Sequence, residues 1–201
     1  MATDPISPDL FDGDDFWEEN KSKILLYGAL LLAGLVGFGV YEYQRQTKKA
    51  ASQTAYAQAA TEAELQNVTK DFAGTVPAGD AAIQLADKLR GEAKYDEAVT
   101  VLRDFIAKYP EHPLIAGAWV SLASTLELQG KADEALEIYQ QAATKFPNSY
   151  AAPLALNSQA RLLAAKGNKD GASRLYEDVV ARYPESIYSR EAMRELRLLK
   201  R

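Results

Sequence analysis

The dipeptides Tyr109-Pro110, Phe146-Pro147 and Tyr183-Pro184 recur at a fixed interval of 37 residues. A basic residue precedes each dipeptide: Lys108, Lys145 and Arg182. An alanine stands twelve positions before each proline: Ala98, Ala135 and Ala172. A period between about 20 and 50 residues with such fixed positions is typical of stacked helical repeats. The spacing therefore predicts an all-α protein, an α-solenoid of about three helix pairs.

Local signals define the helices within each repeat. Gly130 and Gly167 separate the two helices of a pair, where the left-handed backbone of a helix C-terminus suits glycine. Asp133 and Asp170 follow near the start of the next helix, where the helix dipole favours a carboxylate. Each proline ends a second helix because the residue before it is pushed out of the α region. The expected helices are 80–90 and 95–108, 114–128 and 132–145, 151–165 and 169–182, with a capping helix at 187–200.

The N-terminal segment differs in charge from the rest of the chain. Residues 1–20 carry seven acidic residues and no Lys or Arg. Such a composition does not bury enough apolar surface to offset the entropy lost on ordering, so we expect a disordered acidic tail at 1–20. The chain has a net charge of −5 and its basic residues are scattered, a pattern that argues against nucleic-acid binding.

The segment from Ile24 to Tyr41 contains 18 residues and no charge. As a helix rising about 1.5 Å per residue it would be roughly 27 Å long, close to the hydrocarbon thickness of a bilayer. A buried core helix and a cleavable signal peptide are the alternatives. A signal peptide would have basic residues before the apolar run, whereas an acidic segment precedes this one. We therefore interpret residues 21–43 as a single transmembrane anchor.

Two features of this anchor leave alternatives open. The flanking basic residues favour a cytoplasmic C-terminal region by a single charge only. Small residues at Ala29, Ala33 and Gly37 recur every fourth position and form one helical face. Another membrane helix could approach this face closely, or the face could simply contact lipid.

Residues 44–76 are expected to link the anchor to the repeats. From Gln44 to Phe72 the chain is rich in Ala, Gln, Glu and Lys and lacks Gly and Pro, which favours one continuous helix that packs on the first pair. Glycine and proline in the stretch 73–79 should break that helix. The repeat domain, including the capping helix, is then expected over 77–201.

The sequence contains few residues that could support catalysis. His112 is the only histidine, it lies between Glu111 and Pro113, and the chain has no cysteine. These residues do not complete the common His/Cys metal sites, and the sequence has no phosphate-binding loop or nucleophile elbow. We expect His112 to be exposed to solvent. We also expect no catalytic residue, no metal or cofactor and no small-molecule substrate.

The second helix pair resembles the tetratricopeptide signature. It has a tryptophan, leucine, glycine, alanine, aromatic residue, alanine and proline at matching offsets: Trp119, Leu122, Gly130, Ala135, Tyr139, Ala142 and Pro147. The third pair has Leu156 in place of the tryptophan, and the first has Ala86 in place of a helix-packing glycine. The period of 37 rather than 34 residues implies about three extra residues at the junction after each proline. This lengthened junction resembles the tetratricopeptide repeats of bacterial envelope proteins such as the cell-division coordinator that binds the Tol system and the lipoprotein of outer-membrane assembly.

The N-terminal third resembles the ancillary subunit of the SecYEG translocon. The resemblance rests on the acidic tail, the stretch Phe16-Trp17-Glu18-Glu19-Asn20-Lys21, the single apolar span and the Ala-rich helix around 50–56. It implies a single-pass protein of the bacterial inner membrane with a cytoplasmic N-terminus and a periplasmic repeat domain. The implied partners are proteins: translocon subunits, exported clients or chaperones. The alternatives are a general scaffold for cell division or outer-membrane assembly and a cytoplasm-facing regulatory subunit of an enzyme.

The same resemblance implies a binding groove along the first helix of each pair. Motif alignment places five polar residues there: Asp87, Arg90, Glu127, Asn157 and Arg161. Such side chains could bind an extended peptide or a partner helix through charge-assisted hydrogen bonds, or they could form a solvated surface. With only three pairs, the helix expected over 44–72 could instead fill the groove.

Overall fold

The computed structural model describes residues 13–199, and the regular elements among them are all helices. It divides into two compact units, Met1–Lys48 and Lys49–Arg201. The acidic tail expected at 1–20 lies partly outside the described residues, and for residues 13–20 the expected disorder is wrong. Helix α1 begins at Gly13 and runs without a break into the apolar segment, and extending an existing helix is easier than starting a new one.

Helix α1 (Gly13–Gln58) carries the apolar segment of the first unit. Its large side chains are exposed, with Leu25 at 64% and Phe38 at 66% of their full accessibility. By length and composition the helix could cross a membrane, and its apolar stretch has no buried part. A core helix of a soluble protein would be buried, so that alternative loses support. A transmembrane span and a signal sequence both fit α1.

The continuous helix expected from Gln44 to Phe72 is wrong, because the chain leaves the helical conformation at residues 59–61. Thr61 starts the next helix, α2 (Glu62–Asp71), through a capping box. The Thr61 hydroxyl accepts a hydrogen bond from the backbone N–H of Glu64, and the Glu64 carboxylate accepts one from the backbone N–H of Thr61 at 2.9 Å. These bonds satisfy the first N–H groups of α2, so the break needs neither glycine nor proline.

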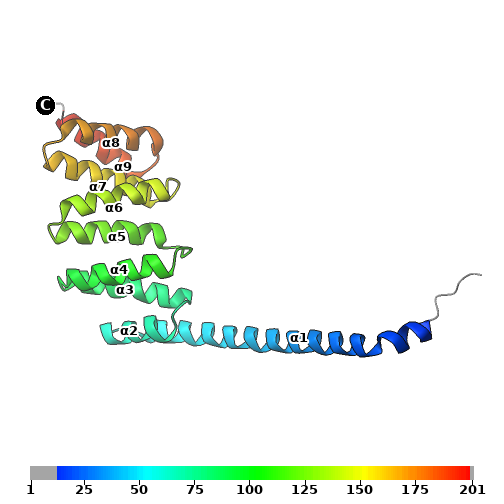
Figure 1. The fold of residues 1–201 in the computed structure, drawn as a ribbon. Helices are drawn as coiled ribbons and strands as arrows, with labels where there is room; N and C mark the ends of the chain where they lie inside the picture. Colours follow the sequence, from blue (N-terminus) through cyan, green and yellow to red (C-terminus); the bar gives the residue numbers. More distant parts are fainter. Residues whose placement is uncertain (1–12, 200–201) are drawn as a thin grey trace, which may run out of the picture. The chain divides into compact units, whose positions relative to one another are not determined.

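The second unit contains the expected helix pairs and final helix, which follow one another along the stack in Figure 1. The second and third pairs and the start of the final helix agree with the prediction to within one residue. The elements are α3 (Val76–Gly91), α4 (Tyr95–Lys108), α5 (Ile115–Leu128), α6 (Ala132–Lys145), α7 (Ala151–Ala165), α8 (Lys169–Arg182) and α9 (Ile187–Leu199).

Helix α3 begins four residues earlier than predicted. The Thr75 hydroxyl accepts a hydrogen bond from the backbone N–H of Ala78, and Pro77 lies in the first turn. Proline is tolerated there because the first N–H groups of a helix have no partner within it. The proline that was expected to break a helix therefore helps to start one.

The two helices of each pair are joined by a residue with a left-handed backbone. Gly130 and Gly167 have φ angles of 78° and 84°, as the sequence predicted. Ala93, which lies 37 residues before Gly130, has a φ of 58°. A left-handed conformation costs a residue with a Cβ about 1–2 kcal/mol. The first repeat therefore pays a backbone penalty that the later two avoid.

The residue before each proline also ends the second helix in the same way. The backbone N–H groups of Tyr109, Phe146 and Tyr183 each donate to the carbonyl four residues earlier. Phe72, another 37 residues toward the N-terminus, ends α2 with the same bond to Val68. Helix α2 therefore takes the place of the second helix of a preceding pair, although Ala73 stands where the proline would be.

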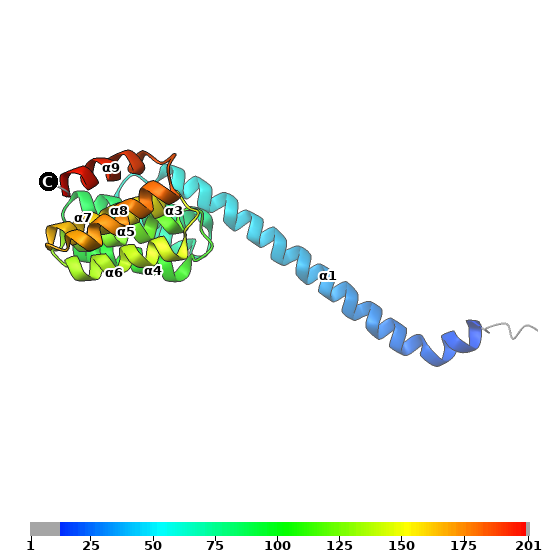
Figure 2. The same ribbon diagram turned by 90° about the horizontal axis from the view of Figure 1, so that it is seen from above.

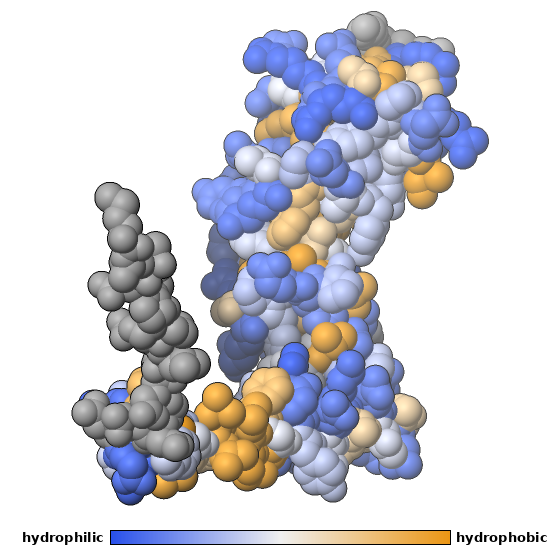
Figure 3. Space-filling view, turned by 90° about the vertical axis from the view of Figure 1, so that its right-hand side faces the viewer, coloured by the Kyte–Doolittle hydropathy of each residue, from blue (hydrophilic) through white to orange (hydrophobic). Residues whose placement is uncertain are grey.

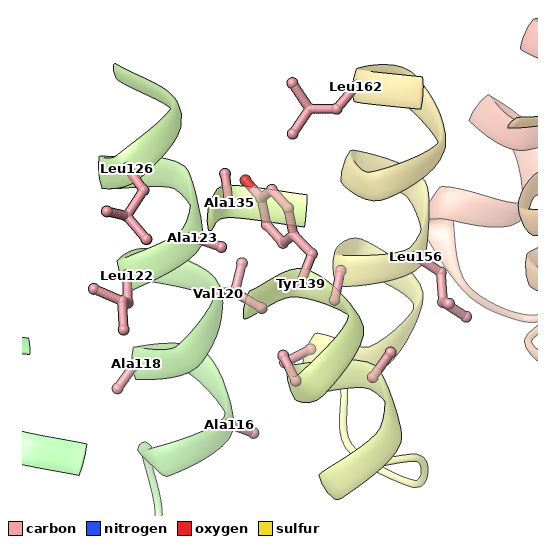
Figure 4. Close-up of a cluster of buried hydrophobic side chains, with 14 of the residues drawn as sticks. Ala116, Ala118, Val120, Leu122, Ala123, Leu126, Ala135, Tyr139, Leu156 and Leu162 are labelled. Atoms are coloured by element: carbon pink, nitrogen blue, oxygen red, sulfur yellow. The ribbon is translucent and has the colours of Figure 1, made fainter. Parts of the chain in front are cut away.

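The core consists largely of small side chains on one helix facing larger ones on the next. Ala98, Ala135 and Ala172 are fully buried. In the middle of the stack the ring of Tyr139, which is 2% exposed, lies between α5 and α7 (Figure 4). Alanine lets the helices of a pair approach closely, and the large ring fills the space that this approach leaves between pairs.

Helix α9 packs against α7 and α8 at the C-terminal end of the stack (Figure 2). Its Ala192 and Ser189 are buried, while Met193 and Leu198 face outward. The helix covers the apolar side of the third pair, which agrees with the expected capping role.

Candidate protein-binding groove

Polar side chains on α3, α5 and α7 link neighbouring repeats. Arg90 of α3 donates from Nη2 to the hydroxyl of Ser124 on α5 over 3.0 Å. Arg161 of α7 forms an ion pair with Glu127 of α5, with a closest N–O distance of 2.7 Å. Arg90 and Glu127 are 37 residues apart, as are Ser124 and Arg161. The same two helix positions therefore form both links, and the arginine stands at the first position in one link and at the second position in the other.

These residues border an open cavity of about 430 Å³. Tyr139 reaches it from α6, and its hydroxyl lies 3.4 Å from the Glu127 carboxylate. The remaining lining combines apolar side chains with hydroxyl groups: Val120, Leu128, Leu154, Ser121 and Ser158. A row of apolar positions with hydrogen-bonding groups at its edge is the kind of surface that holds an extended peptide or a helix face.

The hydroxyl of Tyr139 is held in its neutral form. Burial, followed by the negative charge of Glu127, raises the pKa of Tyr139 to about 12. At neutral pH the hydroxyl keeps its proton and donates a hydrogen bond to the Glu127 carboxylate. Since Glu127 also accepts from Arg161, this carboxylate joins α5, α6 and α7 at the floor of the cavity.

The predicted groove residues do not all lie in this cavity. Arg90, Glu127 and Arg161 line it. Asp87 lies outside the lining and pairs with Arg90 over 3.2 Å. Asn157 was expected to project into the groove, but it is only 6% exposed and its Oδ1 has no hydrogen-bond partner among the described residues. That expectation is wrong because packing around α7 encloses the side chain.

Ser124 and Tyr139 line the cavity but are not among the predicted groove residues. Ser124 lies 37 residues after the predicted residue Asp87 and 37 residues before the predicted residue Arg161, so the three occupy equivalent positions in successive repeats. Shifting either of those positions by 37 residues would have identified it. Tyr139 is the aromatic residue of the repeat signature; its ring is buried, while its hydroxyl reaches the cavity.

Residues 44–72 contribute nothing to the lining of this cavity. In α2, Leu65 and Val68 instead pack against Leu85, Leu89 and Ala98 at the N-terminal end of the stack. The described surface of the repeats is shown from one side in Figure 3, where hydrophilic residues dominate and hydrophobic residues form separate patches.

His112 is buried, contrary to the expected solvent exposure. It is 5% exposed, its Nε2 lies 3.2 Å from the Val76 carbonyl oxygen, and its Nδ1 accepts from the backbone N–H of Leu114 at 3.2 Å. The ring also meets Phe105 edge to face at 5.1 Å. Close approach to α3 is possible because Gly79 has no side chain there. His112 thus fixes the junction after α4 to the start of α3.

Within residues 13–199, no group of three or more His, Cys, Asp or Glu side chains is arranged to hold a metal ion. On α1, the small residues Ala29, Ala33 and Gly37 are all exposed. A Cβ added at Gly37 would meet no heavy atom within 4 Å. Close approach by another helix is therefore sterically open at this position.

The profile of the tetratricopeptide repeat-like domain family matches residues 14–198. The match covers most of the chain, and the chain belongs to this family. No curated protein matches the sequence.

Solved structures of low sequence identity share the fold. A tetratricopeptide repeat protein from Parabacteroides merdae has 23% identity and a TM-score of 0.52, with 60% of this chain and 45% of that chain covered. A chain of a T3SS complex from Aeromonas hydrophila has 17% identity and a TM-score of 0.53, with coverages of 76% and 96%. BtubC from P. vanneervenii has 16% identity and a TM-score of 0.55, with coverages of 77% and 65%. The chain thus spans less than half of the first of these proteins.

Proposed function

We propose that this protein is a non-enzymatic, membrane-anchored scaffold that binds protein partners through its repeats. One observation carries the proposal: the same chain has an apolar helix whose side chains are exposed and a tetratricopeptide-like stack with a mixed polar and apolar cavity. Exposed apolar side chains over the length of a bilayer favour insertion into lipid. A solenoid presents its binding surface across several repeats, which suits protein segments better than small substrates.

The proposed location is the bacterial inner membrane beside the Sec translocon. In this arrangement the N-terminus is cytoplasmic, and the repeat domain lies in the periplasm near exported clients or chaperones. Support comes from the resemblance of residues 16–56 to the ancillary translocon subunit. We assign the face formed by Ala29, Ala33 and Gly37 to contact with a membrane partner, because small side chains allow two helices to approach closely.

Co-purification tests the translocon assignment. The full chain, extracted from bacterial membranes in mild detergent, is expected to carry SecYEG subunits with it. Replacing Ala29, Ala33 and Gly37 with leucine should remove them, because the added side chains keep the helices apart. Gly28→Leu with Gly39→Leu is the matched control, since these residues lie on a different face. A preparation that holds division or outer-membrane-assembly proteins instead of SecYEG would support the general envelope scaffold.

Protease treatment of spheroplasts tests the orientation. A tag at the C-terminus should be digested when only the outer surface of the inner membrane is accessible. A tag that stays protected until detergent is added would contradict the periplasmic location and support a cytoplasm-facing role. A periplasmic protein of known location and a cytoplasmic protein are the two controls.

A further inference from the structure

The side of the stack formed by α4, α6 and α8 contains a second kind of groove. Between α6 and α8, with α7 as its floor, lies an open cavity of about 540 Å³. We call it the α6–α8 groove. Leu156 lies on its floor, and Gln140, Gly171, Arg174 and Arg182 line it. It shares no lining residue with the cavity that contains Arg90, Glu127 and Arg161.

The corresponding position one repeat earlier, the α4–α6 groove, holds a side chain of the protein itself. Trp119, 37 residues before Leu156, packs there against the core. The Lys145 ammonium lies 4.9 Å from the centre of the Trp119 ring. Arg103 and Glu134 form an ion pair of 3.3 Å between α4 and α6. An aromatic ring beneath a cation therefore occupies this position in the middle of the stack.

The α6–α8 groove lacks the groups that fill the α4–α6 groove but keeps the cation. Three residues differ at equivalent positions: Leu156 for Trp119, Gln140 for Arg103 and Gly171 for Glu134. Arg182 stands where Lys145 does, and its guanidinium lies 5.2 Å from the centre of the Tyr183 ring. The smaller side chains leave a cavity at the position that an indole occupies one repeat earlier.

The charges at the rim also change between the two grooves. Arg174, which is exposed, stands where the middle repeat has Glu137. Arg182 is paired with Asp178 at 2.8 Å, whereas Arg174 forms no ion pair with another described residue. The α6–α8 groove therefore presents an unpaired cation beside an open apolar floor.

We propose that the α6–α8 groove binds a segment of a partner protein through a tryptophan side chain that has a carboxylate next to it in sequence. The indole would take the place that Trp119 occupies in the α4–α6 groove, within reach of Arg182. The carboxylate would pair with Arg174. The inference rests on the proposed function only in that the occupant is a protein.

A defined peptide tests this site on the full chain in detergent micelles. The probe is acetyl-Ser-Asp-Trp-Ser-amide, and two matched peptides carry Ala for Trp or Lys for Asp. Isothermal titration should detect binding of the probe and much weaker binding of both matched peptides. Saturation-transfer NMR should show that the indole protons are closest to the protein.

Two variants locate the binding site. Leu156→Trp should abolish binding, because the new indole fills the groove as Trp119 does one repeat earlier. Arg174→Glu restores the charge of the middle repeat and should weaken binding about tenfold, as expected for loss of an ion pair with a carboxylate. Lys169→Glu makes the same charge change on α8 outside the lining and should leave binding unchanged. Circular dichroism checks that each variant is folded, and Arg174→Glu decides the question if Leu156→Trp does not fold.

Equal binding of the tryptophan and alanine peptides would overturn the proposal, as would binding that Arg174→Glu leaves unchanged. Sedimentation tests whether the occupant is instead a second copy of the chain. If the chain self-associates, if the probe does not displace this association and if Leu156→Trp abolishes it, the occupant is a second copy and the proposal is overturned. The titration uses neither the translocon nor a membrane orientation. Failure of the SecYEG co-purification would therefore leave the peptide-binding result intact. Failure of the peptide titration would likewise leave the translocon assignment intact.

Discussion

The hydroxyl of Tyr183 donates a hydrogen bond of 2.7 Å to the carbonyl oxygen of Pro147. The bond connects two of the aromatic-proline dipeptides, one repeat apart. Tyr109 makes a related contact, in which its hydroxyl accepts from the backbone N–H of Gly74 at 3.2 Å. Phe146 has no hydroxyl and makes no such bond. Where the residue that ends a second helix is a tyrosine, its hydroxyl thus also ties that repeat to the junction of the repeat before.

Replacing Tyr183 with phenylalanine should weaken the third repeat. The ring remains, but the bond to Pro147 is lost, and a hydrogen bond of this kind contributes about 0.5–1.5 kcal/mol. The lower part of that range is expected, because both groups are accessible to water. Urea denaturation of the full chain in detergent measures the change in the free energy of unfolding. Tyr150→Phe is the control, since Tyr150 is 67% exposed; equal effects of the two changes would contradict the role of the bond.

Ala93→Gly should stabilise the protein. Ala93 has a φ of 58°, and glycine adopts this conformation without the steric cost that a Cβ brings. The expected gain is about 1 kcal/mol, less than the full penalty because glycine also has a more flexible unfolded state. The reverse change, Gly130→Ala at the equivalent position, should destabilise. Thermal unfolding of the two variants checks both signs, and a lower melting temperature for Ala93→Gly would refute the strain.

Gly79→Ala should destabilise the first pair by forcing its new methyl group against His112. An added Cβ at Gly79 would lie 2.7 Å from Cδ2 of the imidazole. Overpacking of this kind typically costs about 1–3 kcal/mol. His112→Ala removes the obstacle, so Gly79→Ala should cost less in that background. A double-mutant cycle measures the coupling, and purely additive effects would show that the two residues do not constrain each other.

Tyr139 should make stability depend on pH in the alkaline range. Its pKa is raised from 10.0 to about 12 in the folded protein. The folded state therefore holds this proton more tightly than the unfolded state, and stability falls as pH rises from about 10 to 12. Below pH 10 the contribution is fully present. Denaturation at several pH values should show a shallower decline for Tyr139→Phe than for the wild type; identical slopes would contradict the assignment.

Several features of the fold could be predicted because their signals act over a few residues. Gly130 and Gly167 mark left-handed helix ends, and the residues before Pro147 and Pro184 end their helices, as the structure confirms. The break at Thr61 was also local, since Thr61 and Glu64 form a capping box. This signal consists of neither glycine nor proline, so a prediction of helix breaks from those two residues alone does not find it.

Other features depend on neighbours that are far apart along the chain. The burial of His112 follows from the missing side chain at Gly79, 33 positions away, and that of Asn157 from packing around α7. The pairing of Glu127 with Arg161 joins two repeats. Composition and spacing around any one of these residues do not reveal such partners.

The 37-residue period and its turn residues were sufficient to define the order of the helices and their stacking, because caps, glycines and prolines act on the backbone nearest to them. Packing between repeats then settled which polar side chains are paired, which are enclosed and where space is left. Trp119 fills one groove while Leu156 leaves its equivalent open. That difference arises because the shape of a groove depends on side chains from three helices at once.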